Sequence, residues 1–231
     1  MNKFLINIAL ILLVIINPIY ADLAQLDDYI EQLNKQDNAS IIYKKNAVKY
    51  SKEQQRLINY LNSIKTMVAD FIQISPDGSS SEGQFFLLRP GKLRWQYNPP
   101  VPIQIIINGD NLIYYDYELN EATYTEVDQI MGAFLTAKQV DFSNEQINLE
   151  HEQKYGLVKL VVTKNIQSKS SKQNFKKMIM IFNNQPLELK KIEFIDNDNE
   201  LTSVSFHNIK FNRELDKSLF TFKNPRILKQ N

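Results

Sequence analysis

The sequence predicts a mainly β fold (α+β) of about ten or eleven antiparallel strands, in one large curved sheet or an open β-barrel that helices partly cover. The first observation is that short apolar segments and turn residues recur at near-regular intervals from residue 66 onward. The second is that Leu93, Trp95 and Tyr97 alternate with charged and amide side chains, the period of a strand with one apolar face. The third is the pair Asn108-Gly109, which is typical of tight hairpins. Short turns between such segments favour antiparallel pairing.

Residues 1–21 have the features of a secretory signal peptide. Lys3 supplies a positive charge, residues 4–16 are apolar apart from Asn7, and Ala21 is the small residue before the expected cleavage point. This apolar run is shorter than the roughly 20 residues that span a bilayer. We therefore predict cleavage after Ala21, with an uncleaved membrane anchor as the alternative.

Two helical segments are predicted before the first strand. Residues 22–50 form an N-terminal helical extension, because apolar residues recur from Leu23 to Leu33 at the three-four spacing of a helix. A second helix begins at Ser51, with Glu53 and Gln54 in its first turn. Its apolar stripe consists of Leu57, Ile58, Leu61 and Ile64. The main domain is predicted over residues 51–226, followed by a tail at 227–231.

The strands follow from apolar runs bounded by turn residues. They are predicted at residues 67–74, 83–88, 92–97, 103–107, 112–117, 122–127, 147–153, 157–163, 177–182, 187–195 and 201–211. Residues 129–139 are predicted as a short apolar helix between the sixth and seventh strands.

Several predicted strands are apolar on both faces. Residues 85–88, 105–107 and 178–181 are continuous apolar runs, whereas a sheet with one wet face should alternate. Two explanations remain open at this point. Either helices, such as the N-terminal segments, pack on the second face, or the sheet lines an apolar cavity beneath a lid.

Composition argues against several functions. The net charge of +1, with basic residues spread along the chain, favours neither nucleic acid nor an anionic membrane surface as a partner. The sequence has no phosphate-binding glycine loop and no hydrolase or zinc-protease motif, and its histidines, His151 and His207, lie far apart. Asp116 and Glu118 would share a strand face, but they are better explained as solvated acids at a hairpin end. We therefore expect no enzyme activity, no cofactor and no metal site.

From about residue 55 to 226 the chain resembles the periplasmic outer-membrane lipoprotein carrier family LolA. The order and spacing of several short motifs, together with the signal peptide, make up this resemblance. The motifs are Tyr60–Thr66 before Ala69–Gln73, Gly83–Phe85 before Arg89–Trp95, Asn108-Gly109 with Tyr115-Asp116, the apolar helix around Phe134-Leu135, and Leu219–Phe222 with Pro225.

The resemblance implies an open, incomplete antiparallel β-barrel closed by helices (LolA/LolB-like), with an apolar cavity that holds the acyl chains of lipoproteins. It implies a monomeric periplasmic carrier that takes lipoproteins from an inner-membrane ABC transporter to an outer-membrane acceptor. The chain has no cysteine, the residue that is lipidated in bacterial lipoproteins, so it is not itself expected to be an anchored acceptor. A lipid-sensing or regulatory module of the same fold, or a combined carrier and acceptor, are the alternatives.

The resemblance also points to candidate site residues. Arg89 matches the arginine of the family's Arg-Pro motif, which is implicated in holding the lid closed and in passing cargo onward. Leu93 departs from the family, which often has an aromatic residue there. The candidates for lining the acyl-chain cavity are Phe71, Phe85, Leu87, Leu93, Trp95, Tyr97, Ile105, Ile107, Tyr115, Phe134 and Leu135.

Overall fold

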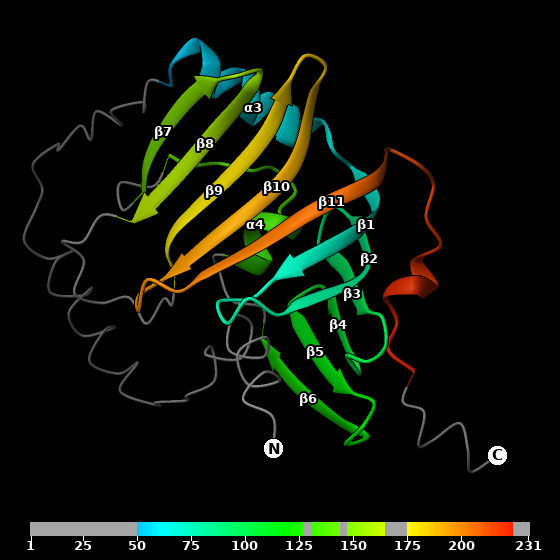
Figure 1. Cartoon of the computed structure of the whole chain (residues 1–231). Helices are drawn as coiled ribbons and strands as arrows, with labels where there is room; N and C mark the ends of the chain where they lie inside the picture. The colour runs from blue at the N-terminus through cyan, green and yellow to red at the C-terminus, as the bar shows by residue number, and fades with distance from the viewer. Residues whose placement is uncertain (1–49, 127–130, 144–146, 165–174, 224–231) are drawn as a thin grey trace, which may run out of the picture. The chain divides into compact units, whose positions relative to one another are not determined.

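The computed structural model describes residues 50–126, 131–143, 147–164 and 175–223. In chain order, its helices and strands are α3 (Lys52–Ser63), β1 (Thr66–Ile74), β2 (Ser80–Leu88), β3 (Lys92–Tyr97), β4 (Ile103–Asn108), β5 (Asn111–Asp116), β6 (Glu121–Glu126), α4 (Met131–Thr136), β7 (Ile147–Lys154), β8 (Leu157–Lys164), β9 (Phe175–Asn184), β10 (Leu187–Asp196), β11 (Leu201–Phe211) and the 3₁₀ turn η1 (Lys217–Phe220) (Figure 1). The signal peptide, the extension up to residue 49 and the tail, all predicted above, lie outside the described residues.

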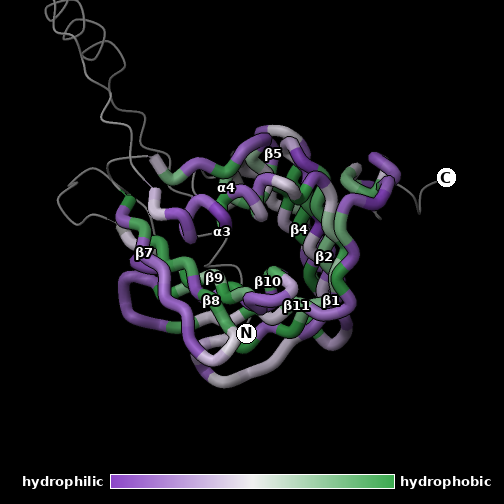
Figure 2. The backbone as a smooth tube through the Cα atoms, turned by 90° about the horizontal axis from the view of Figure 1, so that it is seen from above, coloured by the Kyte–Doolittle hydropathy of each residue, from purple (hydrophilic) through white to green (hydrophobic). Residues whose placement is uncertain are grey.

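All the described strands belong to one antiparallel sheet of 11 strands, in the order β6-β5-β4-β3-β2-β1-β11-β10-β9-β8-β7. Strands that pair in the sheet also follow one another in the chain, except at one place, where β1 pairs with β11 and joins the two halves. Strands β6 and β7 are its two edges, so the sheet is open. The predicted open antiparallel architecture is therefore confirmed. In Figure 2 the curved sheet bends round α3 and α4, which lie on its concave side.

The concave side, here called the inner face, carries the hydrophobic core. Alternate residues of most strands point to it, and the largest of them are almost fully buried. The core on this face includes Met67, Phe71, Phe85, Leu87, Leu93, Tyr97, Ile105, Ile107, Leu160, Met180, Ile192, Val204 and Phe206. Helix α3 buries Leu57, Ile58 and Leu61 in the same cluster. At about 1.5–3 kcal/mol for each buried large apolar side chain, this cluster is the main source of stability.

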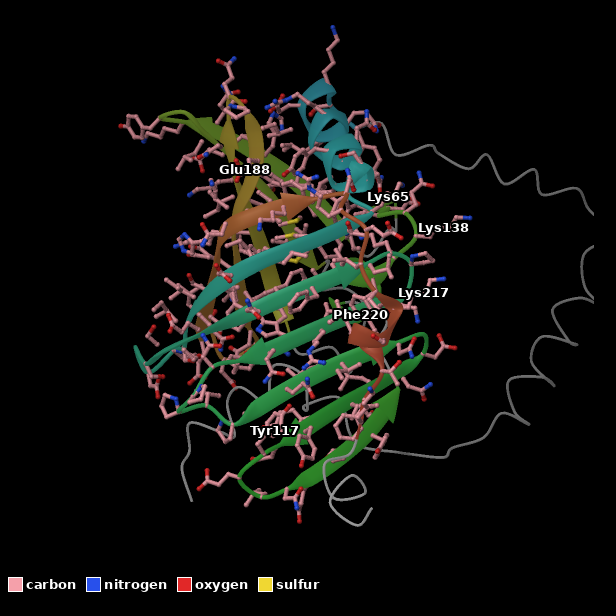
Figure 3. All side chains as sticks on the ribbon, turned by 90° about the vertical axis from the view of Figure 1, so that its right-hand side faces the viewer. Lys65, Tyr117, Lys138, Glu188, Lys217 and Phe220 are labelled. Atoms are coloured by element: carbon pink, nitrogen blue, oxygen red, sulfur yellow. The ribbon has the colours of Figure 1, made fainter. Side chains whose placement is uncertain are left out.

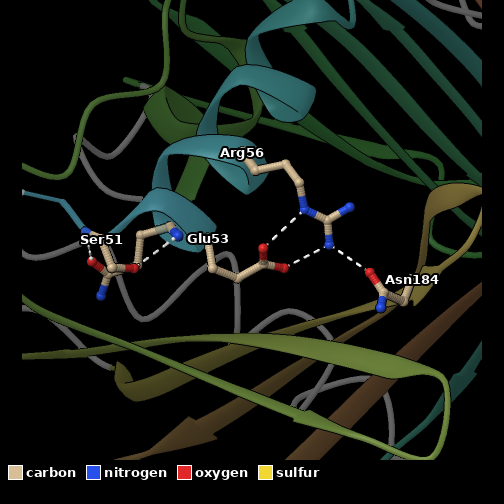
Figure 4. A network of polar contacts seen from close by, with 5 residues as sticks. Ser51, Glu53, Arg56 and Asn184 are labelled. Atoms are coloured by element: carbon tan, nitrogen blue, oxygen red, sulfur yellow. Dashed lines mark hydrogen bonds and ion pairs between the residues drawn. The ribbon is translucent and has the colours of Figure 1, made fainter.

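Helix α3 begins where the sequence predicts. The Ser51 hydroxyl accepts the backbone N–H of Gln54, and the Gln54 side chain accepts that of Ser51, which completes a capping box. Arg56, one turn into the helix, pairs with Glu53 at 2.6 Å and also donates to Oδ1 of Asn184 at the end of β9 (Figure 4). The start of α3 is thus fixed both locally and to a distant strand.

The convex side, here called the outer face, is covered at one place by the C-terminal segment. Figure 3 looks onto this face and shows Phe220 of η1 over the strands of the first half of the sheet. Phe220 is 0% exposed and Ile106, on the outer face of β4, is 1% exposed. Arg94 of β3 donates to the carbonyl oxygen of Leu219 at 3.2 Å and ties η1 down. This packing explains why residues 105–107 are apolar on both faces, because η1 packs against the outer face of β3 and β4.

Several element boundaries differ from the prediction, and β2 and α4 are two of them. Strand β2 starts at Ser80 rather than at residue 83, because Ser80 pairs with Ile74 across a short turn. In the region predicted as one helix over 129–139, α4 ends at Thr136. The chain then turns so that the backbone of Val140 can pair with Asn62. Within the described part of the chain, no helix combines the length and apolarity that crossing a bilayer requires.

Candidate functional site

The centre of the inner face is an aromatic cluster on β1, β2 and β3. The Phe71 ring lies 5.1 Å from the Trp95 ring and 5.1 Å from the Tyr97 ring, both edge-on. Phe85 lies 5.2 Å from Trp95 and 5.5 Å from Phe206 of β11. These contacts join the two halves of the sheet across the β1–β11 seam. The predicted site residues on β1 to β4 are therefore brought together on one apolar surface.

Arg89 connects this surface to both helices. It follows β2 directly, and its Nε donates to the carbonyl oxygen of Leu135 in α4 at 2.9 Å. Its Nη1 donates to the carbonyl oxygen of Leu61 in α3 at 2.6 Å and to that of Ile64, the C-cap of α3, at 3.4 Å. Burial lowers the pKa of the Arg89 guanidinium to about 10. One cation thus holds carbonyl groups of two separate helices.

Helix α3 is anchored along its length to the second half of the sheet. The Gln54 amide donates to the carbonyl oxygen of Leu149 on the edge strand β7 at 2.7 Å. The Tyr60 hydroxyl accepts the backbone N–H of Leu189 on β10 at 3.0 Å, and its ring packs edge-on against Phe182. With the Arg56–Asn184 bond, α3 is tied to three strands. Helix α3 is therefore held to the second half of the sheet at several points along its length.

The hydrogen bonds described here for helix α4 reach its last turn or the residues after it. Besides the Arg89 bond, the backbone N–H of Gly91 donates to the carbonyl oxygen of Thr136 at 2.8 Å. Asn62 of α3 makes two bonds to Val140, donating to its carbonyl oxygen at 3.1 Å and accepting its N–H at 2.6 Å. We refer to this pair of bonds as the Asn62 clamp. Helix α4 is thus a short cover over the inner face, attached through Arg89 and the Asn62 clamp.

The structure corrects one predicted site residue. Tyr115 pairs with Gln104, whereas Tyr114 pairs with Ile105, so alternation places Tyr114 on the inner face and Tyr115 on the outer face. The Tyr115 ring packs against Phe222 at 5.1 Å, near η1. The motif that joins Asn108-Gly109 to Tyr115-Asp116 points to Tyr115, whereas the pairing register of β5 with β4 selects Tyr114. Phe134 and Leu135 of α4 are partly buried and pack against the inner core, as expected for the cover.

Sequence reasoning also missed the polar residues of the inner face. Gln73 is 4% exposed and its Oε1 accepts the hydroxyl of Tyr97 at 2.8 Å. Burial raises the pKa of the Tyr97 hydroxyl, and burial together with Asp116 raises the pKa of Tyr114 to about 12. Both phenols therefore stay neutral at physiological pH. Gln73 is two residues from Phe71 on β1, so the strand period places both side chains on the same face, and this spacing could have predicted Gln73 as a residue of the inner face.

The Asn62 clamp leads to a testable expectation. Asn62→Ala removes both bonds to Val140, and a neutral hydrogen bond contributes about 1 kcal/mol, so we expect a loss of about 1–2 kcal/mol in unfolding free energy. We also expect faster hydrogen exchange at the Val140 amide. Asn59→Ala is the matched control, because Asn59 is exposed on the same helix and bonds only to Gln55 among the described contacts. Equal amide exchange in the two variants would show that the clamp does not hold this segment.

The site is thus an apolar sheet face covered by two helices, which a buried arginine holds through their carbonyl groups. Comparison with known proteins specifies the class. Residues 62–223 match the family described as "Outer membrane lipoprotein carrier protein LolA", and the chain belongs to this family. The predicted resemblance is therefore confirmed.

Two outer-membrane lipoprotein carrier proteins support the same family. The outer-membrane lipoprotein carrier protein of Methylococcus capsulatus is 31% identical over 74% of this chain and 84% of its own. That of Legionella pneumophila (strain Corby) is 32% identical over 72% of this chain and 83% of its own. The crystal structure of an uncharacterized conserved protein from Thermus thermophilus aligns with 75% of this chain and 96% of its own, with a TM-score of 0.49 and 14% identity.

Proposed function

We propose that this protein is a periplasmic carrier that binds the acyl chains of lipoproteins against its inner face and shuttles them from the inner to the outer membrane. The observation that carries the proposal is the apolar inner face covered by α3 and α4, with Arg89 holding both helices. Family membership supports the lipoprotein as cargo. The predicted signal peptide supports a periplasmic location.

The physical requirement for such a carrier is a large apolar area. Burying one methylene group is worth about 0.8 kcal/mol, so a chain of 14–16 carbons is worth about 10 kcal/mol. A lipoprotein with two or three chains would not leave a membrane for water unaided. The aromatic and aliphatic side chains of β1 to β4 and β8 to β11 supply a surface of the required kind.

The structure supports α4 as the part that moves when cargo enters. Residues of the inner face such as Phe71 and Phe85 are 1% exposed, so an acyl chain reaches them only if the cover is displaced. Helix α3 is tied to three strands, whereas α4 is attached through Arg89, Gly91 and the Asn62 clamp. Loading breaks the Arg89 bond to Leu135, and release allows it to form again. We infer that an inner-membrane lipoprotein-releasing ABC transporter drives loading and that an outer-membrane acceptor receives the cargo.

The experiment is to purify the protein from the periplasm and to titrate it with an acylated lipoprotein and with a fluorescent fatty acid. We expect binding with one-to-one stoichiometry, and we expect acylated lipoproteins to be found by mass spectrometry of the purified protein. Depletion in cells should leave lipoproteins in the inner membrane. If neither probe binds and lipoprotein sorting is unchanged on depletion, the carrier function is wrong. No described feature favours the lipid-sensing alternative.

A further inference from the structure

The inner face holds buried polar groups that the proposed carrier function does not explain. Among the described residues, the buried side-chain polar atoms without a hydrogen-bond partner are Oγ of Ser75, Oγ of Ser81 and Nε1 of Trp95. Ser81 and Trp95 lie on β2 and β3, and Ser75 directly follows β1. Leaving such a group unpaired costs about 1–3 kcal/mol, so each is expected to meet a partner in some state of the protein.

These groups lie on the inner face of β1 to β3, but not at one point. Trp95 pairs with Phe85, four residues along β2 from Ser81, so it lies about 13 Å from Ser81 along the strands, and only the two serines are close together. Ser81 pairs with Gln73 across β1 and β2, and alternation along β2 places Ser81 on the same face as Phe85. Ser75 is two residues beyond Gln73, which makes it the diagonal neighbour of Ser81, about 7–8 Å away in an antiparallel pair. Both serines are 5% exposed. Gln73 lies opposite Ser81, but its Oε1 accepts the Tyr97 hydroxyl and neither serine hydroxyl has a hydrogen-bond partner.

The chemistry of these groups selects the kind of ligand atom. An indole N–H can only donate, and a serine hydroxyl can donate, so the missing partner is a hydrogen-bond acceptor. Among the acidic groups at this end are Asp77, in the turn after β1, Glu82, which alternation places on the opposite face of β2 from Ser81, and Asp116 at the corresponding end of β5. Arg89 is eight residues from Ser81 along β2, about 26 Å at the rise of a strand. A neutral carbonyl therefore fits this end better than a phosphate or a free carboxylate.

We propose that Ser75 and Ser81 bind the ester and amide carbonyls through which acyl chains are joined to the lipidated cysteine of the cargo. This inference rests on the proposed carrier function and adds which part of the lipid lies where. The polar linkage lies at the Ser75–Ser81 end of the inner face. The chains run along Phe85 and Leu87 of β2 toward the helices.

The test compares two synthetic lipopeptides with the same chains, one a diacyl ester and the other a dialkyl ether that lacks the carbonyls. Binding of each is measured to the full protein purified from the periplasm and to its Ser81→Ala variant. Since a neutral hydrogen bond is worth about 0.5–1.5 kcal/mol, we expect wild type to prefer the ester, and Ser81→Ala to reduce this preference by about threefold to tenfold. Affinity for the ether should not change.

Ser80→Ala is the matched control, because Ser80 is the neighbouring residue on the opposite face and is exposed. It should leave the preference for the ester intact. Ser75→Ala repeats the test with the neighbouring donor if Ser81→Ala does not fold.

The outcomes separate the two proposals. If wild type binds ester and ether equally, or if Ser81→Ala weakens both to the same extent, the hydroxyls serve an ordered water or packing and the inference is wrong. If wild type binds neither lipopeptide, the carrier function itself is wrong.

Discussion

Replacing Arg89 by leucine is expected to give a protein that accepts acylated cargo but releases it poorly. With the inner face covered, the guanidinium donates to carbonyl groups of α3 and α4, and in the proposed mechanism the bond to Leu135 in α4 is the one that loading breaks. A hydrogen bond to a charged group contributes about 1.5–3 kcal/mol, and the desolvation of the buried cation offsets part of this. Losing the bond to α4 favours the loaded state over the empty, covered one.

A net shift of about 1.4 kcal/mol corresponds to tenfold tighter retention of the lipid. The measurement is the rate of transfer of a loaded lipoprotein to acceptor membranes, together with the dissociation constant of a fluorescent fatty acid. We expect slower transfer and a lower dissociation constant for Arg89→Leu. Arg213→Leu is the control, because it removes a guanidinium that is exposed and follows β11 rather than β2. Transfer by Arg89→Leu at the wild-type rate would contradict the role assigned to Arg89.

Replacing Gly83 by alanine is expected to destabilise the protein by about 3 kcal/mol or more. A Cβ atom at this position would lie 2.0 Å from the backbone oxygen of Gln96 and 2.9 Å from the Phe71 ring. The first contact is with the backbone of the neighbouring strand β3, so no side-chain rotation relieves it. Because Phe71 is central to the aromatic cluster, the substitution also disturbs the inner face.

For a domain of this size, such a loss lowers the melting temperature by about 6–12 °C. Thermal unfolding measures it directly. Gly78→Ala is the comparison: Gly78 has a φ of +80° but nothing lies within 4 Å of a Cβ there. A left-handed conformation costs a non-glycine residue about 1–2 kcal/mol. If the two variants unfold at the same temperature, close approach of β2 and β3 is not the reason for glycine at position 83.

Much of the fold could be predicted because its signals are local. The serine before α3 and the glutamine three residues later form a capping box within four residues of chain. Apolar alternation from Leu93 to Tyr97 and the hairpin at Gly109 depend on neighbours close in sequence. Antiparallel strands joined by short turns then pair mainly with their neighbours in the chain, so the order of the sheet follows except where β1 meets β11.

The candidate site was predicted in part. Arg89 and the apolar positions of β1 to β4 came from the motif order and from alternation. The sheet face on which Tyr115 lies could not be predicted in this way, because a single residue in a motif does not fix the register of β5 against β4. The unpaired groups of Ser75, Ser81 and Trp95 were also not predictable, because being unpaired depends on everything around them.

By itself, the amino-acid sequence determined the β-rich class, the start of α3, the positions of the strands and the carrier family. The tertiary structure alone decided how these parts meet. It placed Arg89 against Leu135, 46 residues away, and Asn62 against Val140, 78 residues away. It also placed η1, with the buried Phe220, against β3 and β4. The physical reason is that capping, turns and alternation are properties of neighbouring residues, whereas these contacts exist only once the curved sheet has brought distant segments together.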